Sequence, residues 1–441
     1  MTPRWADIGL TATLVIGFAA VGETALRRRS RDLPAWNESF LAGMAVCAAA
    51  LFPLSLWLPR SALRIELALL AGGLLVALLR RARRVPRAAR SWPRGRWDPV
   101  QLALLTAVVL VAVEFTAVDL RYSLLWDGFQ IWASKAQRLY YQGGLDRHWY
   151  SGDGYDFRLV AYPPLVPLGE ALLQVVRGQF DFDSVKPVFL PLYYSMLIAT
   201  YAAVRAVAPG RLAAAATLTL ALLPLTSTYQ AAGGYGDMPQ AAFVAGTVGA
   251  AFRGRDSGDA LPWLIGGLAM VKPEGTILAI VACLASGLVW RIERRPIRSV
   301  PWGRIAVVAG FLILRLGYLR WVGAVDTTYA VSRESLPVAV ARFPHVARVC
   351  MVKMLSPRRW GLLWPAFGLA ALVLARRGSP LERSLAIATA ATAVLFAMIF
   401  LFTTWPLDLH IDQAYPRLLA QLSPAAVVAV FAGWSLAQPV S

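Results

Sequence analysis

Long apolar runs recur along the chain of 441 residues, and short arginine-rich stretches separate them. The first run, from about Ile8 to Leu26, ends in RRRSRD. A helix needs about 20 apolar residues to cross the hydrocarbon core of a bilayer, so repeated runs of roughly that length predict a multi-pass membrane protein. The composition agrees, because 58% of the residues are hydrophobic and only 16% are charged. We therefore expect an all-α, polytopic transmembrane bundle.

We predict about thirteen membrane segments in this bundle. Several of them fall short of the about 20 residues that a crossing needs, and the segment 260–271 is the shortest. Their approximate cores are 8–26, 39–58, 62–80, 99–118, 187–207, 211–228, 238–253, 260–271, 275–290, 304–320, 359–375, 384–403 and 417–437.

The positions of the arginines test the predicted number of membrane segments, because basic loops collect on the cytoplasmic face of a membrane protein. With thirteen segments, the four strongest basic loops all fall on one face, which leaves the N-terminus outside and the C-terminus inside. Without the segment 260–271, the later basic loops would fall on the opposite face. The four loops are 27–31, 80–96, 291–298 and 376–383.

The basic residues, the cysteines and the first apolar run each exclude a class of protein. The net charge of +19 comes mainly from loop arginines that face anionic lipid, so we expect no nucleic-acid partner. None of Cys47, Cys283 and Cys350 belongs to a CxxC pair, so neither a disulfide framework nor a zinc site is indicated. The run 8–26 carries its charges on the C-terminal side and has no A-x-A cleavage site, which indicates a retained helix rather than a signal peptide.

Unusual polar residues gather on the face opposite the basic loops. Residues 1–96 hold three apolar segments and a basic loop, whereas 97–441 hold the other segments and a long outer stretch, 119–186. Shorter outer turns contain the sequences GGYGDMPQ, KPEG and LDLHIDQAYPR. Because none of these pieces is large enough to fold alone, any chemistry is expected at helix ends and outer loops.

Asp127 follows Trp126 just beyond the predicted outer end of the segment 99–118. One interpretation is a wet carboxylate near a helix end. The other is a general base, because Trp126 and Phe129 would limit its contact with water, and partial desolvation raises the pKa of a carboxylate toward the range in which a base works. The position alone leaves both interpretations open.

A helical segment with both aromatic and basic residues follows Asp127. Trp132 and other apolar residues recur at three- and four-residue spacing, while Lys135 and Arg138 fall on another side. A second helical element begins near Tyr162. Such helices suit the membrane interface, with their cations near lipid phosphate, and predict a surface for a lipid-attached substrate. Alternatively, the two helices only cover the ends of the bundle.

Three more ionisable residues stand at the next outer turns. Asp237, in GGYGDMPQ, precedes a helix, so it is either an N-cap or a second functional acid. Lys272 and Glu274, in MVKPEG, lie between two apolar segments, where charges are costly and tend to be paired or functional. Either they form an ion pair with each other, or Lys272 binds a phosphate while Glu274 orients it.

Asp408, His410, Asp412 and Arg417 occur within ten residues near the C-terminus. This spacing is weak for a metal site, so a divalent metal is possible in principle but is not indicated. Arg417 opposes the positive-inside trend and suits a phosphate. The other outer cations, which we expect to anchor an interfacial helix, are Arg342, Arg348, Lys353, Arg358 and Arg359.

Five ordered motifs, WDGFQIWASKA, YPPLVPL, GYGDMP, MVKPEG and LDLHIDQAYPRLLAQLSP, extend over about two thirds of the chain, from Asp127 to Pro424. Together they resemble the GT-C glycosyltransferases, and more closely the bacterial branch related to protein mannosyltransferases and lipid A aminoarabinose transferases. In that family an essential acid lies in the first outer loop of the core, which corresponds to Asp127, and a second acid lies in the next outer loop, which corresponds to Asp237. Two departures are Pro273, where relatives commonly have Asn, and Gly128, which leaves no paired acid for metal binding.

The resemblance implies a GT-C-like core over 97–441, with the first three helices outside it. It implies transfer of a sugar from a polyprenyl-phosphate donor to a hydroxyl of a lipid, glycan or protein acceptor, at the outer face of a bacterial cytoplasmic membrane. Asp127 and Asp237 are then catalytic, with Asp127 as the base, and Lys272 and Arg417 bind the donor phosphate. The residues expected to support them are Glu274, His410, Lys135, Arg138 and Tyr162.

This interpretation implies inversion by a single displacement, and it does not firmly imply any cofactor. One alternative is a transporter or flippase for lipid-linked saccharides, and another is a noncatalytic membrane scaffold. Transporters usually show internal repeats and ionisable residues near mid-span. Here the acids collect on one face and no repeat is visible, which favours the enzyme.

Overall fold

The chain is helical throughout the part that the structure describes. The computed structural model describes residues 5–26, 32–82, 98–147, 160–223, 233–254, 259–294, 296, 301–323, 329 and 332–438. Within these ranges no strand occurs, and an isolated bridge joins Tyr329 to Thr403. Nine helices of the described ranges are long and apolar enough to cross a membrane. The expected all-α, multi-pass architecture is therefore confirmed.

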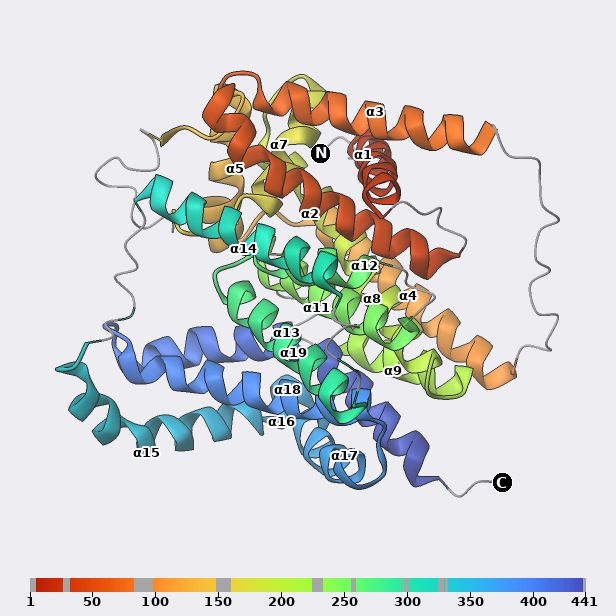
Figure 1. The fold of residues 1–441 in the computed structure, drawn as a ribbon, viewed down its shortest axis with the longest axis vertical. Coiled ribbons are helices and arrows are strands. Elements are labelled where there is room, and N and C mark those ends of the chain that lie inside the picture. Colours follow the sequence, from red (N-terminus) through yellow and green to blue (C-terminus); the bar gives the residue numbers. More distant parts are fainter. Residues whose placement is uncertain are drawn as a thin grey trace.

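The nine long helices form most of the bundle in Figure 1. They are α1 (Trp5–Ala25), α2 (Leu33–Trp57), α3 (Ala62–Ala82), α4 (Pro99–Arg121), α8 (Phe189–Arg205) with the preceding turn η3 (Phe182–Val188), α13 (Glu274–Ile292), α14 (Trp302–Val322), α18 (Pro380–Met398) with the following turn η7 (Ile399–Phe402), and α19 (Leu407–Ala437). The other helices are η1 (Gly128–Ala133), α5 (Ser134–Gln142), α7 (Leu165–Arg177), α9 (Gly210–Leu222), α11 (Asp237–Arg253), α12 (Ala260–Leu268), α15 (Ser335–Met354), α16 (Pro357–Trp360) and α17 (Leu363–Arg377).

Each of the thirteen predicted segments contains a helix, but α9, α11, α12 and α17 have 17 residues or fewer and are not among the nine that are long enough to cross. The shortest, α12, has only nine residues. Lys272 follows α12 in the chain, yet its side chain contacts Asp237, the first residue of α11. The chain after α11 therefore returns to the end of the bundle at which α11 begins. The number of crossings stays a prediction.

Ion pairs join segments that the arginine pattern assigns to the same face. Arg253, at the end of α11, pairs with Asp32 and Glu38 at the start of α2, on the predicted inner side. Arg177, at the end of α7 in the predicted outer stretch, lies 3.6 Å from Asp7 near the start of α1. The packing of the helices therefore agrees with the two faces that the sequence predicts.

The three N-terminal helices include a close backbone contact between α1 and α2. A Cβ atom on Gly22 would lie 1.8 Å from the carbonyl oxygen of Ser39, and one on Gly43 would lie 1.8 Å from the carbonyl oxygen of Phe18. Small residues at such crossings let membrane helices approach closely. This contact holds α1 against α2, two helices for which no functional role is predicted.

The two helices predicted at the membrane interface are instead packed into the bundle. All ten residues of α7 from 165 to 174 are buried, and α7 lies against α5, α1 and α2. In α5, Lys135, Ala136 and Leu139 are buried. Because the apolar faces of both helices are used within the protein, the interpretation of these helices as covers for the bundle fits the structure better than an open lipid-binding surface.

The C-terminal region contains more helix than the apolar pattern indicates. The helix α19 begins at Leu407 rather than near 417 and has 31 residues, so Arg417 lies ten residues inside it. The helix α15 lies in the outer stretch whose cations, Arg342 to Arg359, are expected to anchor an interfacial helix. Figure 1 shows α15 at the lower left of the bundle, beside the blue helices of the C-terminal region.

Candidate active site

Asp237 lies at the centre of five ionisable side chains, here called the central cluster: Asp127, Asp237, Lys272, Glu274 and Arg417. Its side chain is buried at the first residue of α11. Oδ1 accepts hydrogen bonds from Lys272 Nζ at 2.7 Å and from Gln421 Nε2 at 2.8 Å. Oδ2 accepts one from Arg417 Nε at 2.9 Å. Gly236 occupies the N-cap position and Asp237 makes no capping hydrogen bond, so the N-cap interpretation is wrong.

Arg417 connects the two acids that the sequence singles out. Its Nη2 lies 2.5 Å from Asp127 Oδ2 and 2.9 Å from Asp237 Oδ2. The guanidinium also lies over the ring of Tyr235, 4.7 Å from the centroid. The Arg417 side chain is 25% exposed, whereas that of Lys272 is 3% exposed. Of the two predicted phosphate-binding cations, Arg417 is therefore the accessible one.

Lys272 and Glu274 are held together at the start of α13. Their charged atoms, Nζ and Oε1, are 3.4 Å apart, so the predicted mutual ion pair is present in addition to the bond to Asp237. A Cβ atom on the next residue, Gly275, would lie 1.8 Å from the carbonyl oxygen of Leu268. A glycine is thus required for α13 to begin directly against α12, which places both charges beside Asp237.

A second glycine brings Asp127 to the cluster. Asp127 precedes the π-helix η1, and a Cβ atom on Gly128 would lie 2.2 Å from the carbonyl oxygen of Gly233. The backbone N–H of Leu125 donates to the same oxygen at 3.1 Å. The segment around Asp127 is therefore fixed against the turn that leads into α11. The π-helix is itself a form often found at functional sites.

The aromatic residues beside Asp127 do not enclose it. Trp126 is 63% exposed and Phe129 is 42% exposed, whereas the Asp127 side chain is 16% exposed. The expectation that these two rings limit access of water is therefore wrong. Arg417 and the turn at Gly233 lie against this segment instead, because the close backbone approach leaves the two rings on the outside.

Tyr162 connects the central cluster to Lys135. The Nζ atoms of Lys272 and Lys135 lie 5.8 and 5.4 Å from the centroid of its ring. Lys135 also donates to the Tyr162 carbonyl at 3.3 Å and lies over the Trp132 ring. The predicted place of Lys135 near lipid phosphate is wrong, because its side chain is fully buried. Burial, and next the positive charge of Arg315, hold the pKa of Lys135 well below its usual range.

Sequence reasoning missed two groups that hold this arrangement. Arg315 of α14 donates from Nη2 to the carbonyl of Ala161 at 2.5 Å, and the Tyr318 hydroxyl donates to that of Val160 at 2.9 Å. An arginine inside an apolar segment was a usable signal, because such a charge is costly and tends to have a partner. Gln421 was the other omission, although it stands one turn after Arg417 and so shares its face of α19.

Two predicted supporting residues lie outside the central cluster. Arg138 pairs with Asp146 at 2.7 Å. His410 is buried, with its Nδ1 2.6 Å from Thr403 Oγ1 and its ring against Phe400. It precedes Arg417 by seven residues, which is about 10 Å along an α-helix. The structure therefore brings together the four principal predicted residues, Glu274 and Tyr162, but neither Arg138 nor His410.

The acids near the start of α19 contact basic side chains of α15 and α16. Asp408 Oδ1 lies 2.6 Å from His345 Nε2, and Asp412 pairs with Lys353 and with Arg359. In the described ranges, no group of three or more His, Cys, Asp or Glu side chains is arranged to hold a metal ion. The carboxylates of this region therefore act here in ion pairs between helices.

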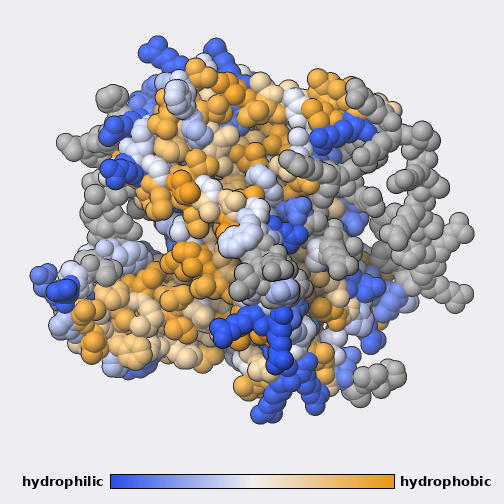
Figure 2. All heavy atoms as spheres, in the orientation of Figure 1, coloured by the Kyte–Doolittle hydropathy of each residue, from blue (hydrophilic) through white to orange (hydrophobic). Residues whose placement is uncertain are grey.

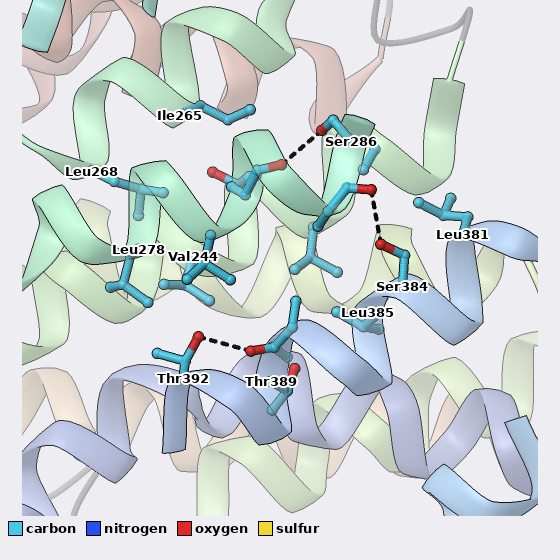
Figure 3. A pocket seen from close by; sticks show the side chains of 18 of the residues that line it. Val244, Ile265, Leu268, Leu278, Ser286, Leu381, Ser384, Leu385, Thr389 and Thr392 are labelled. Carbon is cyan, nitrogen blue, oxygen red and sulfur yellow. Dashed lines mark hydrogen bonds between the residues drawn. The ribbon is translucent and has the colours of Figure 1, made fainter. Parts of the chain in front are cut away.

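An apolar cavity lies next to the central cluster, between α11, α12, α13, α18 and α19. Its volume is about 120 Å³. Leu278 lines it one turn after Glu274, and Leu422 lines it directly after Gln421. Figure 3 shows that the hydroxyls of Ser286 and Thr392 are turned to helix carbonyls, as their hydrogen bonds require. The wall of the cavity is thus suited to an apolar group.

The charges of the central cluster are nearly balanced, with three carboxylates against two cations. Asp237 uses both of its oxygens, whereas Asp127 Oδ1 has no partner among the described residues. Asp127 can therefore still accept a proton from a bound molecule. Comparisons with protein-family models, with curated proteins and with solved structures find no match. The geometry of the cluster and the cavity is thus the basis for assigning a function.

Proposed function

We propose that this protein is a GT-C-like membrane glycosyltransferase. It moves a sugar from a polyprenyl-phosphate donor to an acceptor hydroxyl at the outer face of a bacterial cytoplasmic membrane. The observation that carries the proposal is the carboxylate of Asp127, which keeps one oxygen unpaired while Arg417 holds the other. A base of this kind, beside an accessible cation and an apolar cavity, suits a charged lipid substrate.

Asp127 is the proposed general base. An acceptor hydroxyl that donates to Asp127 Oδ1 would lose its proton there as its oxygen attacks the anomeric carbon. Asp237 has the same chemical group, but three side chains already donate to its oxygens. We therefore assign Asp237 the positioning of Lys272 and Arg417 rather than proton transfer.

Arg417 is the proposed contact to the donor phosphate. Its side chain is partly exposed and its Nη1 makes no hydrogen bond among the described residues, so this nitrogen can donate to a phosphate, whereas Lys272 is enclosed by Asp237 and Glu274. A hydrogen bond from the Arg417 guanidinium would stabilise the charge that develops on the phosphate as it leaves the sugar. Lys272 then acts through Asp237, which it keeps charged and in place.

The apolar cavity supports a lipid-linked donor. The cavity begins at Leu278, one turn after Glu274. An amphipathic molecule could therefore place its phosphate at Arg417 and its apolar tail in the cavity. An outward-facing site on thirteen crossings follows from the predicted faces of the bundle. A single displacement by the acceptor oxygen inverts the configuration at the anomeric carbon.

The test is Asp127→Asn, assayed for transfer from a panel of polyprenyl-phosphate sugars in proteoliposomes. Loss of the base lowers turnover by about 100-fold to 10,000-fold, as is usual for general base catalysis, while donor binding is retained. Asp408→Asn is the matched control, because it removes an exposed carboxylate at the start of the same helix as Arg417. Turnover near that of the wild type in correctly inserted Asp127→Asn protein would reject the assignment.

A transporter of lipid-linked saccharides is the second candidate, and one feature favours it. The helix α12 has only nine residues and ends beside the central cluster, and interrupted helices at a binding site are common in transporters. The same proteoliposomes separate the two functions. Passage of an intact lipid-linked saccharide between leaflets, without transfer of its sugar, would favour the transporter.

A further inference from the structure

The helix α15 runs beside the outer parts of α18 and α19. Arg342 Nη1 donates to the carbonyls of Leu401 and Thr403, at the outer end of the crossing formed by α18 and η7. Farther along α15, Met354 Sδ accepts a hydrogen bond from the Tyr415 hydroxyl, eight residues into α19. Residue numbers thus increase in the same direction on both helices, so α15 runs inward from the outer end of α18.

The end of α15 therefore lies below the outer end of a membrane crossing. From Arg342 to Lys353 is eleven residues, or about 16 Å of helix. Asp412, the partner of Lys353, lies five residues into α19, which is about 8 Å. Since the predicted crossings begin near 417 in α19 and near 359, just before α17, this depth places the end of α15 at the boundary between the headgroups and the acyl chains.

The exposed side of α15 is almost entirely apolar. Arg342, His345 and Lys353 have partners in the protein, and Arg348 is the exposed cation among the apolar residues of this side. Figure 2 shows a largely hydrophobic surface at the lower left, where α15 lies. The large exposed apolar residues of this helix are Leu336, Val338, Val340, Phe343, Met351 and Val352. Together with the depth, this surface indicates that lipid covers α15.

The helix breaks within this apolar surface, between α15 and α17, and cations gather at the break. Lys353, Arg358 and Arg359 lie there, against the single carboxylate of Asp412. Asp412 pairs with Lys353 and Arg359, whereas Arg358 is exposed and has no partner among the described residues. Leu355 and Leu362, on either side of α16, are also exposed. Three cations and one acid leave an uncompensated charge of about two units in a lipid-facing position.

We propose that the α15–α17 break, defined here by Lys353, Arg358, Arg359 and Asp412, binds the phosphate of an anionic membrane lipid. Charges at membrane depth are costly unless they are paired, and a lipid phosphate is the anion that reaches this depth with its own apolar tails. Guanidinium groups match phosphate oxygens in geometry, and two of the three cations are arginines. The exposed leucines beside the break contact the acyl chains of the same lipid.

This site is separate from the central cluster. The break is bound to α19 through Asp412, five residues before Arg417, and none of its cations pairs with Asp127 or Asp237. The proposal therefore stands whether or not the protein transfers a sugar, since it concerns a bound lipid rather than a reaction. A lipid held here would border the apolar surface through which a lipid substrate approaches the cluster.

The test measures lipid binding to the full-length protein in phosphatidylcholine nanodiscs that also contain phosphatidic acid. Native mass spectrometry counts the phosphatidic acid that the protein retains. We expect selective retention by the wild type, and at least a tenfold loss of affinity for Lys353→Gln/Arg358→Gln/Arg359→Gln. Arg348→Gln is the matched control, because Arg348 is an exposed arginine of the same helix without an ion pair, and its affinity should equal that of the wild type.

Arg358→Gln keeps the proposal testable if the triple variant does not fold. Because Arg358 has no partner to lose among the residues that the structure describes, its replacement should leave the melting temperature unchanged and weaken phosphatidic acid binding several-fold, and Arg358→Lys should restore part of it. Equal retention of phosphatidic acid and phosphatidylcholine by the wild type would overturn the proposal. So would wild-type affinity in Arg358→Gln, or equally tight binding of inorganic phosphate, which would show that no lipid is required.

Discussion

The central cluster and the α15–α17 break are both built along the first part of α19, but their charges are balanced in opposite ways. In the cluster three carboxylates meet two cations, and Asp237, Lys272 and Arg417 are joined within 3 Å. At the break three cations meet the single carboxylate of Asp412. Among the described residues the cluster leaves only Asp127 Oδ1 and the buried Glu274 Oε2 of its carboxylate oxygens without a partner, whereas the break has positive charge left for an external anion.

The two groups of charges therefore have different proposed roles: one positions a reactive oxygen, and the other binds an external anion. A nearly neutral, mutually bonded group holds its members rigidly, so that one unpaired oxygen, Asp127 Oδ1, is presented in a fixed direction. An unbalanced and exposed group instead gains stability from an external anion. The cluster is accordingly the candidate for chemistry, and the break is the candidate for lipid binding.

Asp237→Asn should produce the largest change, because it breaks the balance of the cluster. The variant leaves Lys272, which is 3% exposed, without its closest acid, and removal of one partner from a buried ion pair costs about 3–5 kcal/mol. We expect a clear fall in the melting temperature in detergent. Asp127→Asn should lower it far less, since Asp127 is at the edge of the cluster and pairs only with Arg417.

A double variant shows whether the cost comes from the unpaired charge. Asp237→Asn/Lys272→Met removes the acid and the cation together, and should recover part of the lost stability because no isolated charge remains buried. If the double variant is less stable than Asp237→Asn alone, Lys272 has an independent stabilising role and the balance described above is incorrect.

Lys135→Met should produce a smaller effect that depends on pH. The pKa of Lys135 is lowered in the folded protein by burial and then by Arg315, so the unfolded chain holds a proton that the folded chain has lost. Between the lowered pKa and the ordinary lysine value of about 10.4, stability of the wild type then rises with pH, by up to about 1.4 kcal/mol per unit. The variant should lack this slope.

Melting temperatures of the wild type and the variant, measured from about pH 7 to pH 10, test this expectation. The range ends near the ordinary lysine pKa, above which the slope disappears. Arg138→Met is the control, because Arg138 lies one turn later in α5, is partly exposed and pairs with Asp146. Its slope should match that of the wild type. A slope in Lys135→Met equal to that of the wild type would show that Lys135 keeps its proton in the folded state.

The membrane helices could be predicted from the sequence, because lipid exposure requires long apolar runs. The apolar pattern did not predict the outer part of α19 or its contacts with α15, because both involve polar side chains. The start of α19 contains Asp408 and Asp412, and α15 contains Arg342, His345 and Lys353, so both stretches lack a continuous apolar pattern. His345 and Lys353 of α15 contact Asp408 and Asp412 of α19, and contacts between distant segments leave no mark on hydropathy.

The members of the site were more predictable than their contacts. Asp127, Asp237, Lys272 and Arg417 were all assigned to one face, and the structure brings them within bonding distance. Which oxygen stays unpaired depends on ångström-scale approaches, such as that of Gly128 to Gly233, that spacing cannot supply. The burial of Lys135 was missed because helical periodicity shows which residues share a face but not which face meets a neighbour.

Asp412→Asn should produce the smallest change, and it sharpens the contrast between the two groups. Removing the only acid at the break frees Lys353 and Arg359, so affinity for phosphatidic acid should rise by about two- to five-fold, an effect of about 1 kcal/mol that suits a half-exposed ion pair. The measurement is phosphatidic acid retention in nanodiscs, with Asp408→Asn as the control for loss of a carboxylate nearby. A weaker affinity in Asp412→Asn would mean that Asp412 orients the cations for the phosphate, and the break would then be a preorganised site like the central cluster rather than an unbalanced one.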